Sequence, residues 1–211
     1  MRLVSEVWSL KHSTPRDELG GAAVFDFEVY VLMSMELRLG MASDPAKKLR
    51  LQHKLAEHGL TTEDGKRIHG QVLEALVDED SFFTNLKKLL GTQTDAKEVV
   101  FASGLWPEFE FKANSNDDGQ IRSARYWHTR KPAPPSQLDS PNDVAHWSMD
   151  LEEFAEHFGP VKLVEQLPLF HEFLPAYEEH QFEWVDKYGQ TRDYGAGFSW
   201  GLFMSAGQFW D

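Results

Sequence analysis

Alternation of apolar and polar residues over positions 25–39 is the feature that most constrains the fold. Every odd position there is apolar, and Asp26, Glu28, Glu36 and Arg38 stand among the even ones. A period of two places successive side chains on opposite faces of a strand, so the pattern predicts a strand with one buried and one solvated face. The run is about three times the usual strand length, so a bend, a bulge or two linked strands are expected. Such a strand belongs in an antiparallel sheet.

Other segments favour helices and shorter strands. Helices are predicted where a capping residue precedes an apolar stripe of helical spacing, in 43–59, 61–77, 80–91 and 148–160. A hairpin is predicted over 108–128, because two alternating runs flank the turn pair Asp118-Gly119. Closing strands are predicted in 182–185 and 197–204. The predicted fold class is therefore α+β, with an antiparallel sheet (the long strand near 24–39, the hairpin and the C-terminal strands) packed with about four to five helices.

The chain of 211 residues has the size of a single domain, 1–211, and its softest seam is the Pro-rich connection 131–143. The sequence contains no cysteine, which excludes disulfides, thiolate metal sites and a cysteine nucleophile. The first residues hold no apolar run of signal-peptide length, and no uncharged apolar stretch of about 18 residues occurs. We therefore expect a soluble cytoplasmic protein that does not enter a membrane.

Charge is distributed unevenly along the chain. The formal net charge is −13, and residues 132–211 carry most of it, with 14 acidic and 3 basic side chains. The same residues hold 15 of the 27 aromatic side chains, and that combination favours a folded region over a disordered acidic tail. A folded negative surface repels phosphate backbones and attracts cations. We therefore expect a basic protein partner and no nucleic acid.

Four basic residues, Arg122, Arg125, Arg130 and Lys131, lie close together in the sequence at the end of the predicted hairpin, and we call them the positive island. Strand parity puts Phe109, Phe111, Ala124 and Tyr126 on a core face and leaves Arg125 on a surface of mixed charge. This ordinary surface is the favoured interpretation. The alternative is a pocket for a phosphate or carboxylate group, and its candidate residues are Arg122, His128, Arg130 and Lys131.

Four motifs resemble catalytic or metal sites, and each lacks an essential part. GFSWG at 197–201 has the letters of a nucleophile elbow, yet no histidine follows Ser199. NSNDDG resembles the start of a calcium loop, but Arg125 stands where the bidentate glutamate belongs. The segment 110–112 has no upstream aspartate for a nuclease centre, and HEFLPAYEEH has no compact zinc-ligand spacing. No catalytic residue, metal site or cofactor is therefore predicted.

These exclusions leave three classes of function. The favoured class is an acidic binding protein of the inhibitor or immunity type, which covers a basic partner such as a toxin or nuclease with its C-terminal half. The predicted partner-binding residues are Asp150, Glu152, Glu153, Glu156, Tyr177, Glu178, Glu179, Glu183, Trp184 and Asp186. The alternatives are a hydrolytic or metal-dependent enzyme with a site of scattered residues, and a structural or assembly protein such as a phage component. The sequence does not specify the oligomeric state.

Overall fold

The structure, a computed structural model, describes residues 21–38, 45–77, 81–129, 138–168 and 175–208. Over these residues the chain forms five α-helices and two antiparallel sheets, which confirms the α+β class. The helices are α1 (Gly21–Arg38), α2 (Pro45–Ala56), α3 (Thr62–Leu76), α4 (Phe82–Leu90) and α5 (Leu151–Phe158). The strands are β1 (Glu98–Ala102), β2 (Phe109–Ser115), β3 (Ile121–His128), β4 (Lys162–Pro168), β5 (Pro175–Val185), β6 (Thr191–Ser199) and β7 (Leu202–Gln208).

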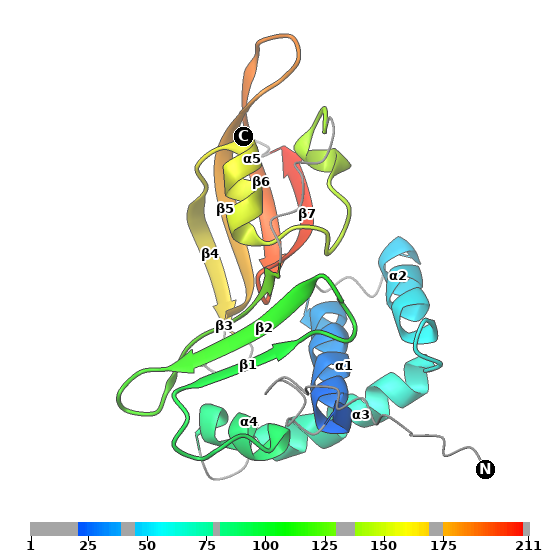
Figure 1. The fold of residues 1–211 in the computed structure, drawn as a ribbon. Helices are drawn as coiled ribbons and strands as arrows, with labels where there is room; N and C mark the ends of the chain where they lie inside the picture. The colour runs from blue at the N-terminus through cyan, green and yellow to red at the C-terminus, as the bar shows by residue number, and fades with distance from the viewer. Residues whose placement is uncertain (1–20, 39–44, 78–80, 130–137, 169–174, 209–211) are drawn as a thin grey trace, which may run out of the picture.

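The chain is arranged in two parts (Figure 1). In the first, α1–α4 gather beside a three-stranded sheet of order β1-β2-β3. In the second, α5 lies against a four-stranded sheet of order β4-β5-β6-β7. Most of the predicted seam at 131–143 lies outside the described residues, and its last three residues form a short 3-10 helix, η2 (Pro141–Asp143). No helix in the described part of the chain has the length and apolarity needed to cross a bilayer.

The long strand predicted near 24–39 is wrong, because this segment forms α1. Odd and even positions of α1 are buried alike, including Phe27, Tyr30, Leu32 and the polar Glu28. The helix is covered on one side by β1 and β2 and on another by α2–α4. A helix that is enclosed in this way is apolar all round, so its sequence shows no helical period. The alternation of the odd positions therefore did not mark an exposed strand face.

The predicted hairpin over 108–128 is confirmed as β2 and β3, with Phe111 opposite Tyr126. All four residues of the predicted core face are buried. The turn is longer than the Asp118-Gly119 pair, and the side-chain oxygen of Asn116 accepts the backbone N–H groups of Asp118 and Gln120. That oxygen therefore closes the turn. The four predicted helices are confirmed as α2–α5, and the predicted closing strands as parts of β5, β6 and β7.

The tip of the β6–β7 hairpin joins the two parts of the molecule. Trp200 and Gly201 form a two-residue turn in which both residues have positive φ, 52° and 81°. Trp200 is 1% exposed, and its ring meets Phe27 of α1 edge-on at 6.1 Å between ring centroids. The N–H of Tyr126 in β3 donates to the carbonyl of Trp200 at 2.8 Å. The GFSWG motif is thus a strand followed by a turn into another strand, whereas a nucleophile elbow leads into a helix.

Replacement of Gly201 by alanine should destabilise the fold by about 2–3 kcal/mol, because positive φ and a steric clash act together. A Cβ at Gly201 would lie 2.9 Å from the carbonyl oxygen of Tyr126. Gly189 in the β5–β6 turn is a matched control, since it has a similar φ of 77° and a Cβ there meets nothing within 4 Å. Urea unfolding of both variants measures the difference. If Gly201→Ala and Gly189→Ala lowered the free energy of unfolding equally, a clash between a Cβ at position 201 and the carbonyl oxygen of Tyr126 would be contradicted.

Candidate functional site

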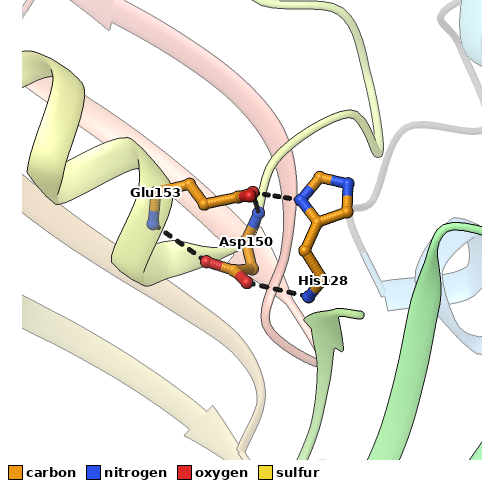
Figure 2. Close-up of side chains that lie close together, drawn as sticks. All are labelled: His128, Asp150 and Glu153. Atoms are coloured by element: carbon orange, nitrogen blue, oxygen red, sulfur yellow. Dashed lines mark hydrogen bonds and ion pairs between the residues drawn. The ribbon is translucent and has the colours of Figure 1, made fainter. Parts of the chain in front are cut away.

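Three side chains with metal-binding or acid–base chemistry meet where β3 approaches α5 (Figure 2). His128 is the last residue of β3, Asp150 is the N-cap of α5, and Glu153 is the third residue of that helix. One ligand-type atom from each of the three lies within 4.8 Å of the other two. His128 was a candidate residue of the alternative anion pocket and the two carboxylates were predicted on a partner-binding face, so the contact among the three was not predicted.

The cluster is built on a capping box. Asp150 Oδ1 accepts the N–H of Glu153 at 2.9 Å, and Glu153 Oε2 accepts the N–H of Asp150 at 3.0 Å. These bonds satisfy N–H groups that the first turn of α5 leaves unpaired. His128 adds its backbone N–H, which donates to Asp150 Oδ2 at 3.0 Å, and its ring Nδ1, which hydrogen-bonds Glu153. The cluster therefore ties the first sheet to the start of α5.

The surroundings of His128 favour a cation over an anion. Its side chain is 6% exposed, its ring stacks on Phe109, and Glu108 lies 3.9 Å from its Nε2 on the side opposite Glu153. Burial raises the pKa of Glu153, and hydrogen bonds from the Asp150 N–H and from His128 offset only part of this rise. Glu153 Oε1 is buried and has no hydrogen-bond partner. A buried carboxylate oxygen without a donor is costly, which makes this corner of the structure a candidate ligand site.

Of the other residues of the predicted anion pocket, Arg122 alone lies within the described part of the chain. Arg122 is exposed near the opposite end of β3, about 20 Å away at the rise of an extended strand. Arg130 and Lys131 lie outside the described residues. The described part of the chain therefore does not assemble the pocket.

A second charged network crosses the junction between the two parts. Arg125 of β3 forms an ion pair with Glu178 of β5, and His180 Nε2 lies 3.2 Å from the other oxygen of Glu178. Burial alone would raise the pKa of Glu178, but the hydrogen bond with His180 and the charge of Arg125 outweigh it, and the pKa is lowered. Glu178 is thus neutralised within the chain, and the Arg125 of the positive island is its partner.

The predicted partner-binding residues are divided among several locations. Asp150 and Glu153 belong to the capping box and Glu178 to the buried ion pair. Trp184 is half-buried and packs on Phe158, and Asp186 closes the β5–β6 turn and pairs with Arg192 at 3.3 Å. The other predicted partner-binding residues are exposed or half-buried, and they lie on two opposite sides of the second sheet. Glu152 and Glu156 lie on α5, whereas Tyr177, Glu179 and Glu183 lie on the side away from that helix.

We call the side of the second sheet that faces away from α5 the outer face. Phe154 of α5 packs on Phe182, Phe198 and Phe203, which alternate with outer-face positions along their strands. The outer face carries Lys162, Glu165, Tyr177, Glu179, Gln181, Glu183, Val185, Thr191, Asp193, Gly195, Gly197, Ser205 and Gly207, and Lys162 is the cross-strand partner of Gln181. Strand parity within 175–185 identifies the β5 members of this face, whereas no strand was predicted over the β4 segment.

Two pairs of carboxylates oppose each other directly on the outer face. Glu165 of β4 is the cross-strand partner of Glu179, and Glu183 of β5 is the partner of Asp193. None of the four forms a salt bridge with a residue that the structure describes. Like charges in direct opposition destabilise a sheet. The isolated sheet therefore bears an electrostatic cost that a bound cation would relieve.

A shallow cavity of about 390 Å³ lies beside the Glu165–Glu179 pair. Tyr177 and Glu179 line one side, Gly195 and Gly197 form the floor, and residues 205–208 of β7 line the other side. The floor is low because glycines have no side chains, and the Tyr177 ring lies directly over Gly197, where a Cβ would be 2.4 Å from its hydroxyl. Burial and the charges of Glu179 and Glu165 raise the pKa of Tyr177, so its hydroxyl stays protonated.

Comparison of the chain with family models, with curated protein sequences and with solved structures found no match.

Proposed function

We propose that the chain is a binding protein whose outer face takes a basic protein partner, in the manner of an inhibitor or immunity protein that covers a cationic toxin or nuclease. The observation that carries this proposal is the direct opposition of Glu165 to Glu179 and of Glu183 to Asp193. Lysine or arginine side chains placed between these carboxylates would convert two repulsive pairs into attractive ones.

The shape of the outer face supports the same class of partner. The cavity lies beside Glu179, and its floor beside the Tyr177 ring would accept the aliphatic stem of a long cationic side chain while the carboxylates receive its charged end. Tyr177 offers an aromatic ring and a protonated hydroxyl at this position, and tyrosine is among the residues that contribute most to interface affinity. The field of the four carboxylates would also steer a basic protein toward this face and speed association.

Charge reversal on the two sides of the sheet tests the proposal. Glu179→Lys with Glu183→Lys reverses the outer face, and Glu152→Lys with Glu156→Lys makes the same change in net charge on α5. The probe is a lysine- and arginine-rich peptide, titrated into the full chain and followed by backbone amide shifts in NMR. We expect outer-face reversal to weaken binding by about tenfold or more and the α5 reversal to change it little.

Salt and shift mapping separate specific docking from simple attraction of opposite charges. Binding should weaken as ionic strength rises, and the shifts should concentrate at Tyr177, Glu179, Gly195 and Gly197. If both charge reversals weakened peptide binding equally, or if the shifts spread over the whole acidic surface, binding would depend on net charge alone. Either result would overturn the assignment of the outer face as the binding surface. A basic protein recovered from the native host with the immobilised chain should likewise be lost on outer-face reversal alone.

A further inference from the structure

The cluster of His128, Asp150 and Glu153 presents an imbalance of charge that its own hydrogen bonds do not remove. Two carboxylates from one helix turn and one imidazole from β3 meet in a largely buried corner (Figure 2). No lysine or arginine among the described residues forms a salt bridge with Asp150 or Glu153. The capping box uses one oxygen of Glu153, and the other, Oε1, is buried without any donor.

We propose that His128, Asp150 and Glu153 bind a divalent transition-metal ion, with Zn²⁺ the best match. One imidazole nitrogen and carboxylate oxygens are ligands that Zn²⁺ accepts, and three protein ligands leave a fourth position for water. The two carboxylates balance the charge of the ion and outweigh the partial positive charge at the start of α5. Because this proposal uses none of the outer-face residues, it stands or falls independently of the proposed function.

The groups around His128 are placed as they are around many metal-binding histidines. A metal-bound imidazole usually directs its second nitrogen to a carboxylate, which fixes the orientation of the ring. Here Nδ1 faces Glu153, while Nε2 lies 3.9 Å from Glu108 on the far side of the ring. Phe109 stacks on the ring at 3.9 Å between centroids and holds its plane. On binding, Zn²⁺ would replace the proton that Nδ1 shares with Glu153.

The ion would have a structural consequence. His128 belongs to the first sheet and the two carboxylates to α5, so a metal ion bound by all three would link the two parts of the molecule. Binding to the folded chain alone stabilises it in proportion to the logarithm of the metal concentration above Kd. We therefore expect Zn²⁺ to raise the melting temperature of chelator-treated protein and a chelator to reverse the rise.

Two substitutions remove ligands without removing the helix cap. Asparagine is as good an N-cap as aspartate, and glutamine serves as well as glutamate at the third helix position. Glu153→Gln should therefore fold like the parent chain, whereas Asp150→Asn keeps the cap but has only one acceptor oxygen for the N–H groups of Glu153 and His128, so it should fold with lower stability. His157→Gln, in the last turn of the same helix, is the matched control for loss of a histidine.

Calorimetric titration of the full chain with Zn²⁺, and the visible absorption of bound Co²⁺, provide the measurements. The parent chain and His157→Gln should bind a single ion alike, and each ligand variant should bind about tenfold or more weakly. In the parent chain, Zn²⁺ should shift the ring resonances of His128 and leave those of His180 unchanged. Absence of Zn²⁺ binding in the parent chain, or unchanged binding in the Asp150→Asn/Glu153→Gln double variant, would overturn the proposal.

Discussion

Trp200→Ala should destabilise the whole chain by about 3–5 kcal/mol, as expected when a fully buried tryptophan is truncated. The ring lies at the tip of the β6–β7 hairpin and contacts Phe27 of α1 and Phe111 of β2 at centroid distances of 6.1 and 6.3 Å. The buried side chains of α1–α4 and β1–β3 form one hydrophobic core, which we call the first core, and Trp200 of the second sheet is part of it. Loss of the Trp200 ring would therefore open a cavity in this core. Because the contact joins both parts, we expect a single unfolding transition at a lower denaturant concentration.

Tyr188→Ala is the matched control, since Tyr188 is also an aromatic residue in a hairpin turn of the second sheet. Its side chain is 79% exposed, so the expected change is within about 0.5 kcal/mol. Guanidinium unfolding followed by far-UV circular dichroism and by tryptophan fluorescence reports on both parts. If Trp200→Ala lowered the free energy of unfolding by less than about 1 kcal/mol, the contacts of the hairpin tip would not be what holds the two parts together. Two separated transitions in the parent chain would contradict a shared core.

The error over α1 has a definite physical cause. Period-two alternation identifies a strand only when one face is solvated, and in 25–35 no face is. Tyr30 and Leu32, at even positions, are as buried as Val29 and Val31. The unusual length of the run was the signal against a strand, since fifteen residues suit a buried helix better. Such a helix forms because its neighbours enclose it, and these contacts are not visible in its own sequence.

Features that depend on local chemistry were predictable. The core face of the hairpin followed from parity and a turn glycine, because Phe111 and Tyr126 share a buried face as predicted. Ser81 and Gly91 begin and end α4, as their types indicate. The helix predicted over 148–160 begins later than its predicted start, because the N-cap of α5 is Asp150. The capping-box pattern of Asp150 and Glu153 indicates the correct start of the helix, because the side chain of each residue accepts the backbone N–H of the other.

The candidate site was less predictable because it depends on tertiary contacts. His128 and Glu153 are 25 residues apart, and their contact depends on the packing of β3 against the start of α5. The opposed pairs of the outer face depend on the register of β4 with β5, which has a bulge between Leu163 and Glu165. Composition places most of the negative charge in residues 132–211, but it does not separate Glu178, neutralised by Arg125, from Glu179, which faces another carboxylate.

Glu28 should be the most sensitive polar residue of the first core. It is 0% exposed in α1, and its carboxylate accepts the Ser103 hydroxyl and the N–H groups of Gly104 and Leu105, the latter two at 2.8 and 3.3 Å. Glu28→Ala would leave these buried donors without an acceptor, at a cost of about 3 kcal/mol or more. Glu28→Gln retains an acceptor oxygen for the backbone N–H groups, and we expect it to cost about 1 kcal/mol or less at neutral pH.

The pH dependence of this pair of variants separates burial from hydrogen bonding. Burial raises the pKa of Glu28 above its ordinary value of 4.5, and the three hydrogen bonds offset only part of the rise. The folded state therefore holds the proton more tightly than the unfolded state, so the contribution of Glu28 is fully present below pH 4.5 and is lost as pH rises through the folded pKa. The parent chain should accordingly lose stability relative to Glu28→Gln over that window, as measured by urea unfolding at a series of pH values. A parent chain that instead gains stability relative to Glu28→Gln as pH rises would show that the donors of residues 103–105 outweigh burial and stabilise the ionised carboxylate, and a constant difference would contradict the raised pKa.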